Sequence, residues 1–168
     1  MKPASLLPAL ILVAGLGFGL CLSGQAASDA GVLPVTPACF VNGQRVIPVQ
    51  LEVARSPAER QHGLMERDSL DADAGMLFVY RELRPPEHGF WMYNTRIPLD
   101  IAYLDDRGTI VSIRTMEPCP STKGAQCPSY PAGTPFLSAV EMNAGFFSHR
   151  GIAVGDRLLT GAGDCAGH

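Results

Sequence analysis

Two acidic residues, Asp100 and Glu141, are the side chains of this sequence best suited to acid–base chemistry. A pair of carboxyl groups flanking one bond is the usual machinery of glycoside hydrolysis, although spacing along a chain does not fix a separation in space. Glu141 lies in the apolar segment 136–142, where alternation places it opposite to Val140 and Met142. It therefore faces solvent or, if buried, pairs with an arginine, because an isolated buried carboxylate is costly.

A run of aromatic and polar residues at positions 90–100 is the best candidate for a binding surface. It contains the only Trp of the chain, Trp91, followed by Asn94 and Thr95. An indole face, an amide and a hydroxyl together suit a sugar or a peptide. The alternative is structural: the strand buries part of this run in the core, while Asn94 and Thr95 satisfy the backbone of the turn before Pro98.

Asp100 closes this run, and its carboxylate has three candidate roles. It accepts backbone N–H groups, pairs with Arg67 or Arg96, or contacts a ligand. Polar side chains in or beside apolar segments converge on one another or on a ligand. We therefore expect one pocket to which six residues contribute. They are Arg67, Trp91, Asn94, Thr95, Asp100 and Glu141.

The sequence contains no other catalytic or metal-binding motif. It has no Gly-x-Ser-x-Gly elbow, His-Glu-x-x-His motif or phosphate loop, and its four histidines occupy separate segments. Thioethers of its methionines suit Cu(I), but there is no Met-x-Met cluster, so core packing is the favoured role. We expect no metal and no cofactor. Enzymatic activity stays open through Asp100 and Glu141 alone.

The first residues are typical of an export signal. Lys2 precedes the almost wholly apolar stretch 6–22, and small residues follow it. We expect cleavage after Ala26, which makes 1–26 a signal peptide and places the mature protein in the periplasm or outside the cell. An uncleaved anchor is the alternative, and the membrane is a partner only in that case.

Four cysteines follow Ala26, and an even number in an exported chain favours disulfides. Three pairings are open. Cys119 and Cys127 flank a short loop that closes easily, which leaves Cys39 for Cys165, and we favour this pairing. Structural zinc is the rival interpretation, but no Cys-x-x-Cys motif or nearby His pair supports it.

Length and charge limit the remaining possibilities. About 140 residues after the signal suffice for one domain with one core. The formal net charge of the full chain is −3, and the sequence has no basic run, so nucleic acid is not an expected partner. We expect a flexible segment at 27–37, the domain at 38–160 and a C-terminal tail at 161–168.

Turn and capping signals predict an α+β domain. Asn42-Gly43 is a strong hairpin signal. Ser56 and Glu59 form a capping box that begins a short helix, which ends near Gly63. Asn143 is expected to cap a second short helix that runs to position 149.

About seven strands accompany these two helices. Short strands joined by tight turns favour a mostly antiparallel sheet that curls towards a barrel. The predicted strands cover residues 40–41, 45–54, 76–80, 90–93, 99–105, 109–115, 136–142 and 157–160.

Several separate motifs occur in an order that resembles one known family. They are residues 59–67, 75–78, 90–95, 97–100, 103–105 with Gly108, 140–145, 151–152 and 155–156. This arrangement resembles the DUF192 family, also called UPF0127, over roughly residues 46–159. The resemblance implies an export-associated, single-domain α+β protein and implies no reaction. Tyr93 stands where the family commonly has Lys, which makes the site less basic, and the four cysteines look peculiar to a subset.

Two hypotheses for the function follow from these observations. The leading one is a non-catalytic periplasmic binding or interaction module that uses the surface from Trp91 to Asp100. The alternative is a hydrolase that acts on an envelope glycan or related substrate through Asp100 and Glu141. The expected partner is a small molecule, a glycan or an envelope protein, and the oligomeric state stays open.

Overall fold

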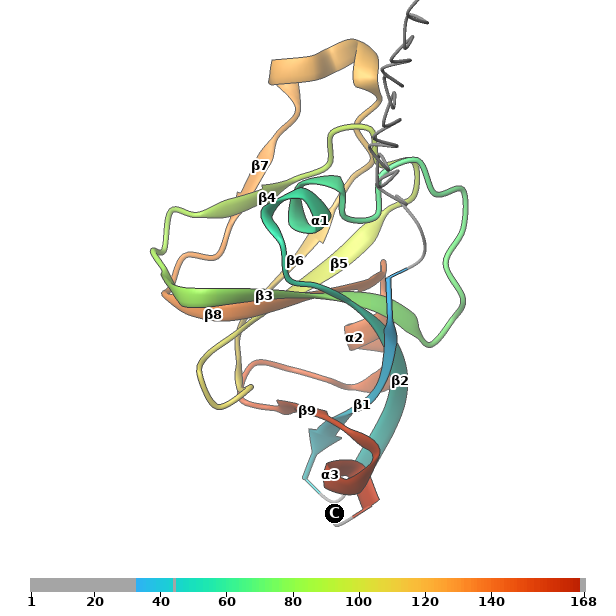
Figure 1. Ribbon diagram of the computed structural model, residues 1–168, viewed down its shortest axis with the longest axis vertical. Helices are drawn as coiled ribbons and strands as arrows, with labels where there is room; N and C mark the ends of the chain where they lie inside the picture. Colours follow the sequence, from blue (N-terminus) through green and yellow to red (C-terminus); the bar gives the residue numbers. More distant parts are fainter. Residues whose placement is uncertain (1–32, 44, 167–168) are drawn as a thin grey trace, which may run out of the picture. The chain divides into compact units, whose positions relative to one another are not determined.

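The computed structural model describes residues 33–43 and 45–166 (Figure 1). The predicted signal peptide, its cleavage site after Ala26 and the alternative membrane anchor all lie outside the described residues. Within the described part of the chain, no helix has both the length and the apolar character needed to cross a membrane.

The described residues form nine β-strands, three α-helices and one 3-10 helix, so the predicted α+β class is confirmed. In chain order the elements are β1 (Val35–Asn42), β2 (Arg45–Ala54), α1 (Pro57–His62), β3 (Ala74–Arg84), β4 (Gly89–Trp91), β5 (Leu99–Leu104), β6 (Ile110–Met116), the 3-10 helix η1 (Ser121–Gln126), β7 (Ser129–Pro131), β8 (Phe136–Asn143), α2 (Phe146–Arg150), β9 (Arg157–Thr160) and α3 (Ala162–Ala166).

Seven of these strands form one sheet in the order β6-β5-β8-β3-β2-β1-β9, and β4 pairs with β7 in a separate ribbon. The larger sheet is mixed. β2 and β3 run parallel, because α1 and the connection 63–73 carry the chain back across the sheet between them. The other neighbouring strands of the described sheet are antiparallel.

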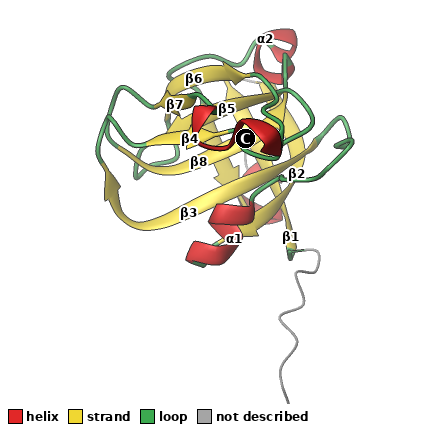
Figure 2. Ribbon diagram, turned by 90° about the horizontal axis from the view of Figure 1, so that it is seen from above, coloured by secondary structure: helices red, strands yellow, loops and turns green. Residues whose placement is uncertain are grey.

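The predicted curl of the sheet is only partly supported. The sheet is curved (Figure 2), and its two edges approach each other at the isolated bridge between Thr109 and Arg157. The edge strands β6 and β9 form no continuous ladder among the described residues. The sheet is therefore not a closed barrel.

Each face of the sheet has its own apolar cluster. Val140 and Met142 of β8 pack in the first cluster, and Ala139 packs in the second. Glu141 lies opposite Met76 of β3 and Ile101 of β5, and both of these belong to the second cluster. Because directly opposed residues share a face, Glu141 points into the second cluster. The predicted alternation in β8 is thus correct.

The capping box of α1 is present as predicted. The Glu59 backbone N–H donates to Ser56 Oγ at 3.2 Å, and the Glu59 carboxylate accepts the backbone N–H of Ser56 at 2.8 Å. Gly63 ends the helix at a positive φ of 51°. The cap of α2 differs from the prediction, because Gly145 occupies the cap position and no side chain caps that helix.

Both disulfides have the pairing that the sequence favours, Cys39 with Cys165 and Cys119 with Cys127. The first of them joins β1 to α3. As a result, the two segments predicted as flexible, 27–37 and 161–168, contain the start of β1 and the whole of α3 in their described parts.

Candidate functional site

A small pocket lies among α1, β4 and the second apolar face of the sheet. Its walls include Arg60 and His62 of α1, Trp91 of β4, Thr95 and the Glu141 side chain of β8. The cavity volume is about 30 Å³, which is room for one or two water-sized groups. Three of the six predicted site residues, Trp91, Thr95 and Glu141, therefore meet at one place.

Glu141 is the unusual group in this pocket. The residue is buried, with an exposed fraction of 5%, and no hydrogen bond or ion pair joins its carboxyl group to a residue that the structure describes. Its oxygens are not among the fully buried unpaired atoms of the described residues, so the carboxyl group opens onto the pocket that it lines. Burial raises the pKa of Glu141 to about 8, which keeps the carboxyl group mostly protonated at neutral pH. A neutral carboxyl group both donates and accepts hydrogen bonds.

The prediction that a buried Glu141 would pair with an arginine is wrong. The neighbouring strands present Met76 and Ile101 to it, and neither carries a charge. Arg60 is the one arginine on the pocket wall, and its Nη1 donates to the carbonyl groups of Arg55 and Val79. The cost of burial is met by protonation instead of by a counter-ion.

Trp91 lies at the rim of the pocket with an aromatic neighbour. Alternation in β4 buries Phe90 and leaves Trp91 46% exposed. The indole ring stacks on Tyr93, with ring centroids 5.1 Å apart and planes 23° apart. Tyr93, the departure from the Lys common in the resembled family, thus widens an exposed aromatic surface.

The turn that carries Thr95 is held by a disulfide-bonded residue. The Asn94 N–H donates to the Cys119 carbonyl at 2.9 Å, and the Cys119 N–H donates to the Thr95 carbonyl at 3.3 Å. Cys119 is in turn bonded to Cys127. Thr95 itself is buried, so its position on the pocket wall depends on this brace.

Asn94 points away from the pocket and supports the same turn. Its φ is 57°, and that of Glu66 is 64°. Asn94 and Glu66 are the residues other than glycine that have a positive φ in the described chain, and they are hydrogen-bonded to each other. The Glu66 N–H donates to the Asn94 carbonyl at 2.9 Å, and Asn94 Nδ2 donates to Glu66 Oε1 at 2.8 Å. Asn94 is therefore committed to the backbone of the turn.

Arg67 also has a partner outside the pocket. Its two terminal nitrogens donate to the carboxylate oxygens of Glu52, at 2.5 and 2.8 Å. Hydrogen bonding to Glu52 raises the pKa of Arg67. This fork ties the connection 63–73 to β2. Arg96, another candidate partner of Asp100, instead pairs with Asp68 at 2.9 Å.

Asp100 and Glu141 are not brought together. Asp100 lies opposite Met142, whereas Glu141 lies opposite Ile101, so the two carboxyl groups point to opposite faces of the sheet. Asp100 accepts the Thr115 hydroxyl at 2.7 Å and the Gly145 N–H at 2.8 Å. Of its three candidate roles, the backbone role is the one that the structure gives it. The carboxyl pair that hydrolysis needs is absent among the described residues.

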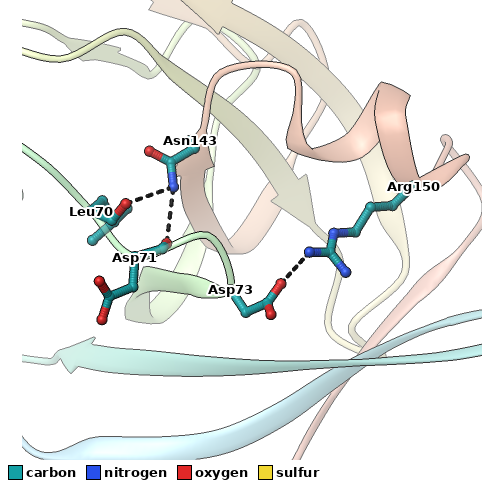
Figure 3. A network of polar contacts seen from close by, with 5 residues as sticks. All are labelled: Leu70, Asp71, Asp73, Asn143 and Arg150. Atoms are coloured by element: carbon teal, nitrogen blue, oxygen red, sulfur yellow. Dashed lines mark hydrogen bonds and ion pairs between the residues drawn. The ribbon is translucent and has the colours of Figure 1, made fainter.

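A polar network fixes the connection between α1 and β3 to β8 and α2 (Figure 3). Asn143 Nδ2 donates to the carbonyl groups of Leu70 at 3.1 Å and Asp71 at 3.0 Å, and Arg150 forms an ion pair with Asp73. This explains why Asn143 does not cap α2, since its side chain is used over a long range. The network also anchors the connection two positions beyond Glu141 in β8.

Sequence reasoning missed the contribution of α1 and the residues after it. Arg60, His62 and Gly63 line the pocket, although none was a candidate ligand-binding residue. The signal was present, because all three belong to the motif 59–67. In the described residues there is no group of three or more His, Cys, Asp or Glu side chains that could hold a metal ion.

A curved mixed sheet and a pocket that a largely buried glutamate and an aromatic rim line define a small α+β domain. The family model DUF192, described as "Uncharacterized ACR", matches residues 39–160. The chain belongs to the DUF192 family.

Two crystal structures share this fold. One is a candidate transcription regulator from Sinorhizobium meliloti 1021, with a TM-score of 0.69 and 30% identity, over 77% of this chain and 96% of that chain. The other is a protein of unknown function from Novosphingobium aromaticivorans DSM 12444, with a TM-score of 0.65 and 31% identity, over 76% of this chain and 86% of that chain. A search of the curated proteins finds no match.

Proposed function

We propose that this protein is a non-catalytic binding module of the periplasm, and that its site is the pocket beside Trp91. The observation that carries the proposal is the carboxyl group of the largely buried Glu141, which has no partner among the described residues and opens onto a pocket with an exposed aromatic rim. A carboxyl group that lines a pocket and has no protein partner is available to bond a ligand there, and polar groups of this kind are typical of binding sites.

The size of the pocket limits what enters it. About 30 Å³ admits a hydroxyl, a carbonyl or a methyl group, but not a whole ring. Trp91 is exposed and stacks on the half-buried Tyr93, and together they offer an apolar platform outside the pocket. A glycan with an N-acetyl group, or a short peptide, combines a flat face for the platform with an amide oxygen that accepts a hydrogen bond from Glu141.

The compartment is part of the proposal. Two disulfides suit an oxidising environment such as the periplasm. The apolar stretch 6–22, which lies outside the described residues, has the composition of an export signal. Envelope glycans and peptides are then the ligands within reach of the pocket.

Trp91 allows a direct test, because it is the only Trp of the chain and lies at the pocket rim. The emission of Trp91 should shift saturably when N,N′-diacetylchitobiose, an N-acetylated disaccharide, or a trialanine peptide is added. Unchanged emission with both probes, together with no heat of binding in calorimetry, would contradict the proposal. Release of hydrolysis products from either probe would instead establish an enzyme.

Variants separate binding from folding. Glu141→Leu should abolish the response to the active probe, and Glu141→Gln should retain it, because Gln keeps a donor and an acceptor. Trp91→Ala, followed by calorimetry, should also lose binding. Val154→Ala is the matched control, since Val154 is another exposed apolar residue and does not line the pocket. Equal loss of affinity in Val154→Ala would rule out a site at Trp91.

A further inference from the structure

A second and larger cavity, of about 440 Å³, lies between α1 and the C-terminal half of β3. Its wall is dominated by guanidinium groups, although the chain as a whole has a formal net charge of −3. The charged side chains around it are Arg55, Arg60, Arg81, Arg84 and Glu82. Positive charge is therefore concentrated at this one place on an acidic protein.

These four arginines lack counter-ions among the residues that the structure describes. The ion pairs found there use Arg67, Arg96 and Arg150 instead. The only acidic residue of α1, Glu59, has its carboxylate occupied by the backbone N–H groups of Arg55 and Ser56, at 2.7 and 2.8 Å. Four cations thus face one remaining acid on the cavity wall.

Two of the arginines are held in place before any ligand arrives. The guanidinium carbons of Arg60 and Arg84 lie 4.7 and 5.3 Å from the centre of the Tyr80 ring. Arg60 Nη1 also donates to the Val79 carbonyl at 3.0 Å, and Arg84 Nη2 lies 3.1 Å from His88 Nδ1. Preorganised cations lose little conformational entropy when they bind an anion.

Arg84 is also not neutralised by any residue that the structure describes. Its Nε is the one fully buried side-chain nitrogen or oxygen in the described residues that has no hydrogen-bond partner. The positive charge of the arginines also affects the neighbouring His88. Burial is the main cause of the lowered pKa of His88, and the charges of Arg84 and Arg60 lower it further.

We propose that this cavity binds the phosphate group of a small phosphomonoester. Arginine forks bind phosphate oxygens in pairs, and a phosphomonoester carries between one and two negative charges near neutral pH. A volume of about 440 Å³ fits a small phosphorylated metabolite or headgroup. The site does not depend on the Trp91 pocket, although Arg60 lines both cavities.

Calorimetry at constant ionic strength tests the ligand class. Glycerol 3-phosphate should bind saturably, whereas glycerol should not bind. If vesicles that contain phosphatidic acid bind and glycerol 3-phosphate does not, the ligand is still a phosphomonoester, and it is a lipid headgroup. Citrate that binds as tightly as glycerol 3-phosphate would overturn the choice of phosphate, and the absence of all binding would overturn the site.

Matched double variants test the residues. Arg55 and Arg81 make no side-chain hydrogen bond to the described residues, so Arg55→Gln with Arg81→Gln should leave the fold intact. Loss of two charge-assisted hydrogen bonds should weaken binding at least about tenfold. Arg45→Gln with Arg107→Gln removes the same charge elsewhere and should change affinity less than about twofold at this ionic strength.

Equal weakening in the two double variants would show that only net charge matters and would overturn the proposal. A change in melting temperature is checked for both variants first. If Arg55→Gln with Arg81→Gln proves unstable, the single variant Arg81→Gln replaces it. Glu141→Leu should bind glycerol 3-phosphate as the wild type does, so that failure of the Trp91 pocket and failure of this site remain distinguishable.

Discussion

Replacement of Glu141 by Gln should change how the stability of the protein depends on pH. Burial raises the pKa of Glu141 from 4.5 to about 8. The folded state then keeps a proton that the unfolded state releases, so the free energy of unfolding falls as pH rises between these two values. Below pH 4.5 and above pH 8 this group contributes no further change.

The size of the effect follows from the same two values. Each pH unit within the window removes up to about 1.4 kcal/mol from the free energy of unfolding. The whole window therefore corresponds to at most about 5 kcal/mol, a large part of the stability of a domain of this size. Glu141→Gln keeps the shape and the hydrogen-bonding capacity of the neutral acid but cannot ionise. Its stability should lack this decline.

Urea denaturation from pH 5 to pH 9, with the disulfides kept oxidised, measures the difference. The two proteins should unfold at similar urea concentrations at pH 5, and the variant should be the more stable at pH 8. Glu87→Gln is the control, because Glu87 is exposed, and its profile should parallel the wild type. Parallel profiles for Glu141→Gln and the wild type would refute the argument that burial keeps this carboxyl group protonated.

Three further perturbations test the elements that position the site. Ser56→Ala should lower the free energy of unfolding by about 1 kcal/mol, because a first-turn N–H of α1 loses its acceptor; an unchanged urea midpoint would exclude the cap. Asn94→Ala should cost about 2 kcal/mol through its positive φ and the lost bond to Glu66, while Asn94→Gly should cost less; equal losses would contradict a backbone role. Replacing Cys119 and Cys127 by Ser should cost about 2 kcal/mol and increase acrylamide quenching of the nearby indole, and unchanged quenching would show that the disulfide does not brace the turn.

Local signals in the sequence predicted local structure well. Asn42-Gly43 produces the hairpin in which Asn42 of β1 lies opposite Arg45 of β2. Ser56 and Glu59 form the reciprocal bonds of a capping box. In each case the interacting groups lie within a few residues, so the residue types nearly determine the geometry. Asn143 shows the limit of this reasoning, because its side chain bonds to carbonyl groups about 70 positions away in the chain.

Which of the predicted site residues come together depends on how the strands pair, and no short segment of the sequence specifies that pairing. Alternation within β8 gave the correct face for Glu141 relative to Val140. The face of Asp100 relative to Glu141 depends on how β5 pairs with β8, and there Ile101, not Asp100, lies opposite Glu141. A shift of one residue would have put both carboxyl groups on one face. Two acidic residues on neighbouring strands therefore have different roles: Asp100 anchors a backbone N–H group, and Glu141 lines the pocket without a partner among the described residues.

The arginine cluster was hidden for a related reason. The charges come in two pairs separated by a connection and most of a strand, so neither the net charge nor any short window of sequence indicates them. Because β2 and β3 are parallel, the chain must return to the start of β3 through a crossover that contains α1. In the folded protein α1 lies beside the C-terminal half of β3, so the two pairs of arginines line one cavity. Arg60 then contacts both cavities from one helix. The six-residue helix α1, which its capping box stabilises, thus contributes one wall of the Trp91 pocket and one arginine of the larger cavity.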